Sequence, residues 1–105
     1  MAKYIFLATY SNEATKGIVG GDSDRVAAMQ ALCDSVGAKL ISADITRGEY
    51  DVCVIVEADS FAQIAAMSLK ARASGAADKF VTLEAVDIEE IRSVAKGVQY
   101  TLPSG

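Results

Sequence analysis

The sequence predicts an α+β fold with a four-stranded antiparallel sheet, on the basis of three observations. Segments rich in aromatic and β-branched residues alternate with segments whose apolar residues recur every three or four positions, as strands and helices do. The chain has 105 residues, of which 51% are hydrophobic, which suits one packed domain and excludes a disordered chain. The link between the second and third strand-like segments is short, which favours an antiparallel hairpin.

The first third of the chain predicts a strand, a loop and a helix. Residues 3–10 are rich in aromatic and β-branched types and predict a strand. Residues 11–21 include several glycines and predict a loop. A helix is expected from Asp22 or Ser23, either of which can cap its first turn, to about Val36, with Gly37 as its stop. The expected inward face of this helix holds Val26, Met29, Leu32, Cys33 and Val36.

A hairpin and a second helix are expected next. The hairpin joins a strand at 38–45 to a strand at 50–58. Ser60, with Gln63 three residues later, fits a capping box. The capping box predicts the start of an alanine-rich helix that ends at Gly75.

A fourth strand and a short helix complete the predicted domain. The strand covers residues 79–85. Asp87 and Glu90 fit a second capping arrangement at the start of a helix that ends before Gly97. The apolar residues expected to face inward on this helix are Ile88, Ile91 and Val94. We therefore expect a single domain over residues 1–97 and a C-terminal tail over residues 98–105.

The order β-α-β-β-α-β, with a C-terminal helix, is that of a ferredoxin-like sandwich, in which both long helices cover one face of the sheet. The other sheet face is then open, and it should be polar if water covers it. In the first strand, however, Tyr4 and Phe6 on one face and Ile5 and Leu7 on the other are all apolar. A second subunit, the tail or a ligand could cover this face, and a homo-oligomer that packs through the open sheet face is the simplest cover.

Composition excludes several classes of function. The net charge is −4 and the basic residues are scattered, so we expect no binding to nucleic acid or to an anionic membrane surface. The chain has no apolar stretch long enough to span a membrane. It also contains no histidine, which removes Ser-His and Cys-His nucleophiles and histidine-based metal and haem sites. We expect no metal and no cofactor, and any acid–base chemistry would use carboxylates, lysine, tyrosine or cysteine.

The two cysteines, Cys33 and Cys53, lie in apolar segments without a CxxC pairing. They are interpreted as reduced core residues. The N-terminus runs directly into the first strand and lacks the pattern of a signal peptide. Both observations predict a cytoplasmic protein.

Three places carry charge or glycine in a pattern that could bind a ligand. The loop after the first strand combines Lys16 and Gly17 with a helix start, which could hold an anion or be a simple turn. At the hairpin, Gly48 suits a positive φ, and Asp51 could bind a ligand or bond to nearby backbone. Arg25 at the start of a helix could be solvated, bridge subunits or hold a carboxylate.

Together these segments resemble the GYD-domain family. The resemblance covers roughly residues 3–95 and rests on Tyr10, the run Thr15-Lys16-Gly17-Ile18, Arg25, the run Gly48-Glu49-Tyr50-Asp51 and Ser74-Gly75. It implies a ferredoxin-like fold related to dimeric α/β-barrel proteins and no established activity. Related barrel families include small monooxygenases and haem-handling enzymes.

The leading functional hypothesis is a cytoplasmic homo-oligomer that binds a small anionic or amphipathic molecule in a cleft between the two turns. The candidate ligand-binding residues are Thr15, Lys16, Gly17, Arg25, Arg47, Gly48, Glu49, Tyr50 and Asp51. Two alternatives stay open. One is a cofactor-free oxygenase or isomerase in which Glu49, Tyr50 or Asp51 acts as acid or base. The other is a structural module whose surfaces only mediate assembly.

Overall fold

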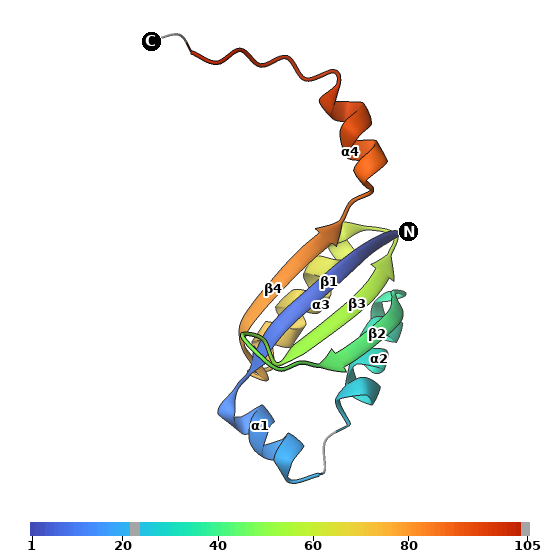
Figure 1. The fold of residues 1–105 in the computed structure, drawn as a ribbon. Helices are drawn as coiled ribbons and strands as arrows, with labels where there is room; N and C mark the ends of the chain where they lie inside the picture. Colours follow the sequence, from blue (N-terminus) through green and yellow to red (C-terminus); the bar gives the residue numbers. More distant parts are fainter. Residues whose placement is uncertain (22–23, 104–105) are drawn as a thin grey trace.

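The computed structural model describes residues 1–21 and 24–103. Within these residues the elements follow the order β-α-α-β-β-α-β-α (Figure 1). The strands are β1 (Ala2–Tyr10), β2 (Lys39–Ile45), β3 (Val52–Ala58) and β4 (Ala77–Ala85). The helices are α1 (Asn12–Val19), α2 (Arg25–Val36), α3 (Phe61–Ala73) and α4 (Ile88–Ala95).

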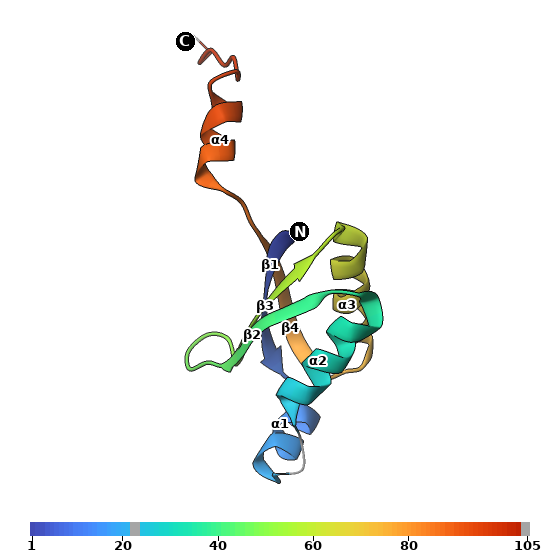
Figure 2. The same cartoon turned by 90° about the vertical axis from the view of Figure 1, so that its right-hand side faces the viewer.

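The four strands form one antiparallel sheet in the order β2-β3-β1-β4. Helices α2 and α3 cover one face of this sheet, and the other face is open (Figure 2). This is the predicted ferredoxin-like α+β arrangement. It follows from the short β2–β3 link, which forces antiparallel pairing, and from the two long connections, which each carry a helix across the same face.

The core lies between the sheet and helices α2 and α3. Alternate residues of a strand point to opposite faces, so each central strand contributes every second side chain to it. On β1 and β3 the buried residues sit opposite one another in the register: Tyr4 with Val56, Phe6 with Val54 and Ala8 with Val52. From the helices, Cys33 of α2 and Ile64 and Met67 of α3 are fully buried against them.

Helix α2 ends and helix α3 begins where the sequence signals indicate. Gly37 adopts a left-handed conformation, with φ of 75°, at the end of α2, as a C-terminal glycine commonly does. At the start of α3, the Gln63 side chain accepts a hydrogen bond from the Ser60 N–H at 2.9 Å, which closes the predicted capping box. The Gln63 amide also donates to the Val36 carbonyl at 2.7 Å, so one side chain ties the start of α3 to the end of α2.

The start of α2 differs in detail from the expectation. The expected caps, Asp22 and Ser23, lie outside the described residues. Asp24 caps the helix instead, because its carboxylate accepts a hydrogen bond from the Ala27 N–H at 3.0 Å. Val26, expected on the inward face, is 55% exposed because it lies in the first turn, at the end of α2 where the cavity described below opens.

The segment expected to be a loop, residues 11–21, contains helix α1. Ser11 is its N-cap, with its hydroxyl accepting from the Ala14 N–H, and Ala14 is buried. A glycine within a helix costs about 1 kcal/mol relative to alanine, which is why Gly17 argued for a loop. The cap and the burial of Ala14 offset that cost, and the helix ends at Gly20.

Helix α4 also differs from the expectation. Ile88, Ile91 and Val94 do not face a core but are 58%, 47% and 70% exposed. After Ala85 the chain leaves the end of β4 and carries α4 away from the sheet (Figures 1 and 2). The helix-covered face of the sheet is occupied by α2 and α3, and α4 does not pack against the open face either.

The open face of the sheet carries six apolar residues at its centre. They lie in two rows across β3, β1 and β4, and the register places Ile55, Ile5 and Leu83 in one row and Cys53, Leu7 and Val81 in the other. We call these six residues the open-face patch. Cys53 was expected in the core, and this prediction is wrong. Its side chain points to the open face of β3, whereas the buried valines of β3 point to the helix-covered face. Both cysteines are free, as expected.

Candidate functional site

A cavity of about 490 Å³ lies between the sheet and the N-terminal end of α2. This volume is in the range of pockets that hold small molecules. Its walls come from all four strands, from the end of α1, from α2 and from the end of α3. Most of the lining is apolar, and its charged or hydroxyl-bearing residues are Tyr10, Asp24, Arg25, Asp44 and Ser74.

Small side chains create the space. Alanine lines the cavity from every side: Ala8, Ala28, Ala43, Ala71, Ala76 and Ala77. Larger residues at these positions would bring apolar atoms into contact across the gap, as they do further along in the core. Met29, Leu32 and Phe80 complete the apolar wall.

Arg25 holds the polar side of the cavity. It is the first residue of α2, and its Nη2 donates to the carbonyl of Ala14 in α1 at 3.2 Å. Its guanidinium carbon lies 5.3 Å from the centre of the Tyr10 ring, a cation–π arrangement. The Nε atom is buried and has no hydrogen-bond partner within the described part of the chain. A buried donor without an acceptor is unfavourable, so this N–H is suited to an acceptor from a ligand.

Asp51 holds the end of β1 in place through the backbone of Tyr10. Its carboxylate accepts from the Tyr10 backbone N–H at 2.8 Å, and its own N–H donates to the Ala8 carbonyl at 2.9 Å. The β1–β4 register shifts between Thr9 and Tyr10. Asp51 thus supplies a partner to backbone at an irregular point of the sheet, which is the backbone-bonding role considered for it from sequence.

A smaller recess of about 190 Å³ adjoins the cavity and shares Tyr10, Ile18 and Ile45 with it. Its lining includes Thr15 of α1 and Asp51. The two sequence segments predicted to form a cleft therefore meet here, on either side of Tyr10. The Thr15 hydroxyl donates to the Ser11 carbonyl at 2.8 Å within α1.

A family match appears once the sequence is compared with known domains. The GYD domain matches residues 4–95. The chain belongs to the GYD-domain family. No curated protein matches it by sequence.

Several solved structures share the fold of this GYD domain. FFRP-DM1 is 20% identical, with a TM-score of 0.57, and the match covers 82% of this chain and 100% of that one. A hypothetical protein from Pyrococcus horikoshii is 20% identical over 82% of this chain and 90% of its own, with a TM-score of 0.56. A third structure is a 5-chloro-2-hydroxyhydroquinone dehydrochlorinase from Burkholderia phenoliruptrix in complex with 2,5-dihydroxybenzoquinone. It is 16% identical, with a TM-score of 0.54, and the match covers 86% of this chain and 98% of that one. At these identities the likeness establishes the fold.

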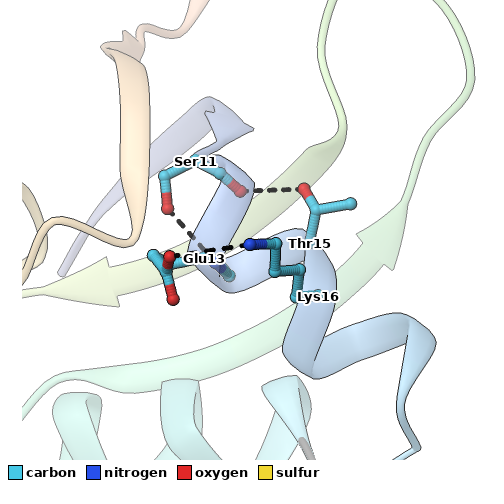
Figure 3. A network of polar contacts seen from close by, with 5 residues as sticks. Ser11, Glu13, Thr15 and Lys16 are labelled. Atoms are coloured by element: carbon cyan, nitrogen blue, oxygen red, sulfur yellow. Dashed lines mark hydrogen bonds and ion pairs between the residues drawn. The ribbon is translucent and has the colours of Figure 1, made fainter.

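Not all of the candidate residues of the GYD domain lie at the cavity or the recess. Arg25 lines the cavity, and Thr15 and Asp51 line the recess. Lys16 is turned along α1 toward Glu13, with 3.9 Å between its Nζ and the carboxylate oxygen (Figure 3). Gly17 follows it in the same helix.

The tip of the β2–β3 hairpin forms a separate cluster. Gly48 has a φ of 133°, the positive value predicted for it. Lys79 of β4 lies over the Tyr50 ring, 5.0 Å from its centre, and 3.5 Å from the Glu49 carboxylate. Tyr50 and then Glu49 raise the pKa of Lys79 above its ordinary value. Arg47 is exposed at the same tip. These four hairpin residues line neither the cavity nor the recess.

Sequence reasoning did not identify Tyr10 as a central site residue. Tyr10 lines both the cavity and the recess, and it contacts both Arg25 and Asp51. The signals for it were its position at the end of a strand and its place among the residues that carry the family resemblance. The alanines that make the cavity carry no local signal, because alanine in a helix or strand is equally common in a filled core.

Two further features concern metals and membranes. Among the described residues, no group of three or more cysteine, aspartate or glutamate side chains could hold a metal ion. None of the helices found in residues 1–21 and 24–103 is long and apolar enough to cross a membrane.

The ionisation of Tyr10 gives a test of its environment. Burial raises the pKa of the Tyr10 phenol above 10.0; the Arg25 charge opposes this and the Asp51 charge adds to it. In alkaline solution the folded chain then keeps a proton that the unfolded chain has lost. The contribution of Tyr10 to the free energy of unfolding is therefore complete below pH 10 and is lost as the pH rises through the folded-state pKa.

Urea unfolding across roughly pH 9–11 measures this contribution. We expect Tyr10→Phe to flatten the alkaline fall in stability. Tyr100→Phe, in the exposed tail, is the matched control. Equal slopes in the two variants would contradict the assigned environment of Tyr10.

Proposed function

We propose that this GYD domain binds a small, mainly apolar molecule that carries an anionic or hydrogen-bond-accepting group. The observation that carries the proposal is the buried Nε–H of Arg25, which has no partner among residues 1–21 and 24–103, at the wall of an apolar cavity of about 490 Å³. The apolar wall favours the body of the ligand, and the guanidinium favours its acceptor.

An anionic acceptor suits this site better than a neutral one. Hydrogen bonds from a guanidinium to an anion are shorter and stronger than those to neutral groups. Arg25 is absent from the ion pairs found in the described residues, and it lines the cavity together with two acidic residues, Asp24 and Asp44. The proposed anionic group therefore lies at the Arg25 side of the cavity. One protein of the same fold is seen with 2,5-dihydroxybenzoquinone, a small ring with acceptor oxygens, and a ligand of that class fits the features of this cavity.

The experiment compares two fluorescent ligands that share an apolar body. 8-Anilino-1-naphthalenesulfonate carries a sulfonate, and N-phenyl-1-naphthylamine lacks it. We expect the sulfonate to bind more tightly, and Arg25→Met to weaken its binding about tenfold or more while changing the neutral compound little. Fluorescence titration of the full chain measures both dissociation constants.

Two control variants locate the binding. Lys16→Met removes an exposed cation that is already near Glu13 and should leave both ligands bound as before. Ala43→Leu adds atoms to the cavity wall and should weaken both ligands. Sulfonate binding that is insensitive to both Arg25→Met and Ala43→Leu would overturn the proposal.

We propose further that the protein is a cytoplasmic homo-oligomer that associates through the open sheet face. The open-face patch supports this, because a water-covered sheet face is normally polar. Two free cysteines are compatible with a reducing compartment. Sedimentation equilibrium tests the association, and a monomer up to the highest soluble concentration would contradict it.

A cofactor-free enzyme has less support. One oxygen of Asp51, the carboxylate proposed as its base, already accepts a hydrogen bond from the Tyr10 backbone N–H. Glu49 and Tyr50, the other candidates, lie at the exposed hairpin tip with Lys79.

A further inference from the structure

Helix α4 and the residues after it form an arm that extends beyond the domain. Every residue from Leu83 to Pro103 is exposed. In both views α4 points away from the sheet, at the end opposite to α1 (Figures 1 and 2). We call residues 86–103 the C-terminal arm.

The arm carries an apolar stripe that water does not favour. Its apolar residues recur at helical spacing on α4 and continue beyond it: Ile88, Ile91, Val94 and Val98. Their exposed fractions run from 47% to 70%. The opposite side of the helix holds charged residues, including Glu89 and Arg92, which pair with each other. An isolated helix of this length is marginal in water, so the stripe implies a packing partner.

The exposed area of the whole chain shows that part of it does not pack against the domain. The chain exposes 7247 Å², whereas a compact monomeric protein of 11.0 kDa exposes about 5,600 Å². The radius of gyration is likewise 17.4 Å, against about 13 Å for a compact domain of this length. An excess of about 1,600 Å² per chain is of the size that one subunit buries in a stable homodimer.

Two features of the arm favour a second copy of this chain as its partner. Apolar residues continue along the chain from Val81 and Leu83 of the open-face patch to the exposed Val86 and Ile88. The charges of α4 are also self-complementary. Its first turn is acidic, with Glu89 and Glu90, and its end is basic, with Arg92 and Lys96, so two copies related by a two-fold axis would bring opposite charges together.

We propose that the C-terminal arm packs against a second copy of this chain and buries the apolar stripe of α4 there. The inference rests on the proposed self-association through the open sheet face and extends that interface to the C-terminal arm. The open-face patch and the stripe of α4 then act as one interface. The arm of each chain stabilises the dimer, while the fold of the domain does not require it.

Sedimentation equilibrium of three full-length variants tests this. Ile88→Ser/Ile91→Ser/Val94→Ser removes the stripe without changing charge, and Glu89→Ser/Arg92→Ser is the charge-neutral control on the polar side. We expect the stripe variant to raise the dimer dissociation constant about 100-fold or more, since six apolar side chains lose burial per dimer. The control removes two of the four complementary charges of α4, so it should raise the dissociation constant only severalfold, far less than the stripe variant. Circular dichroism verifies that the domain remains folded in each variant.

The third variant, Leu83→Ser, separates the two proposals because it changes only the open-face patch. One outcome is that the wild type dimerises, that Leu83→Ser weakens the dimer, and that the stripe variant dimerises as the wild type does. This outcome overturns the arm proposal and leaves the sheet-face proposal standing. A wild type that stays monomeric overturns both. Weakening by the stripe variant beyond the control supports the arm proposal.

Discussion

Replacing Phe6 with alanine is expected to lower the free energy of unfolding by about 3–5 kcal/mol, the largest effect of any single change considered for this chain. Phe6 is 2% exposed at the centre of β1, between Val54 of β3 and Thr82 of β4. Its ring lies 5.2 Å from that of Phe80, tilted by 51°. Alanine would remove this contact and leave a void beside the cavity that already lies near Phe80. Urea unfolding followed by circular dichroism measures the loss.

Leu7→Ala is the matched control for this prediction, because Leu7 is the next residue of the same strand and belongs to the open-face patch. In a dilute sample its effect should be clearly smaller than that of Phe6→Ala. If the open face associates, the effect of Leu7→Ala grows with protein concentration, whereas that of Phe6→Ala does not. Equal losses for the two variants at low concentration would contradict the assignment of the core to the helix-covered face.

Replacing Asp51 with alanine is expected to destabilise the domain by about 1.5–3 kcal/mol, the usual range for a hydrogen bond to a charged group. The change leaves the Tyr10 N–H without its acceptor at the point where the β1–β4 register shifts. It should also loosen the recess that Asp51 shares with Tyr10 and Thr15. Thermal unfolding monitors the first effect.

Glu49→Ala controls for the loss of a carboxylate from the same hairpin. Glu49 is exposed and contacts only the exposed Lys79 among the ion pairs described, so its loss should change stability by about 0.5 kcal/mol or less. Asp51→Asn keeps an acceptor oxygen and should fall between the two. If Asp51→Ala were as mild as Glu49→Ala, the hydrogen bond to Tyr10 would not be important for the fold.

The contacts of Asp51 indicate a structural role for part of the family motif. Asp51 makes its contacts with backbone, and Gly48 provides a positive φ, so part of the GYD motif shapes the hairpin and its attachment to β1. Arg25 differs, because one of its donors faces no acceptor in the described chain. Arg25 is therefore the family-motif residue with the strongest claim to a ligand.

The secondary structure of the core was predictable because local patterns and tertiary packing agree there. Alternation in β1 and β3, the Ser60–Gln63 capping box and Gly37 each specify a local conformation that the fold also needs. Helix α1 was missed because Gly17 favours a loop locally. The capping by Ser11 and the burial of Ala14 favour the helix, and burial depends on the rest of the fold.

The candidate site was predictable in part. Charge and motif position pointed to Arg25, Thr15 and Asp51, which the fold brings around one tyrosine. The same criteria pointed to Lys16 and Arg47, which lie exposed away from the cavity. A charged residue is equally compatible with solvent and with a ligand, so only its neighbours decide between the two roles.

The sequence by itself determined the strand and helix periodicity, the antiparallel hairpin, the helix-covered core and the apolar character of the open face, because each depends on residues close together in the chain. Only the tertiary structure decided that Tyr10 contacts both Arg25 and Asp51, that alanines from three strands and two helices line a cavity, and that α4 points away from the sheet. The physical reason is that a cavity or an orphaned donor depends on how distant segments meet. No short-range pattern in the sequence records that geometry.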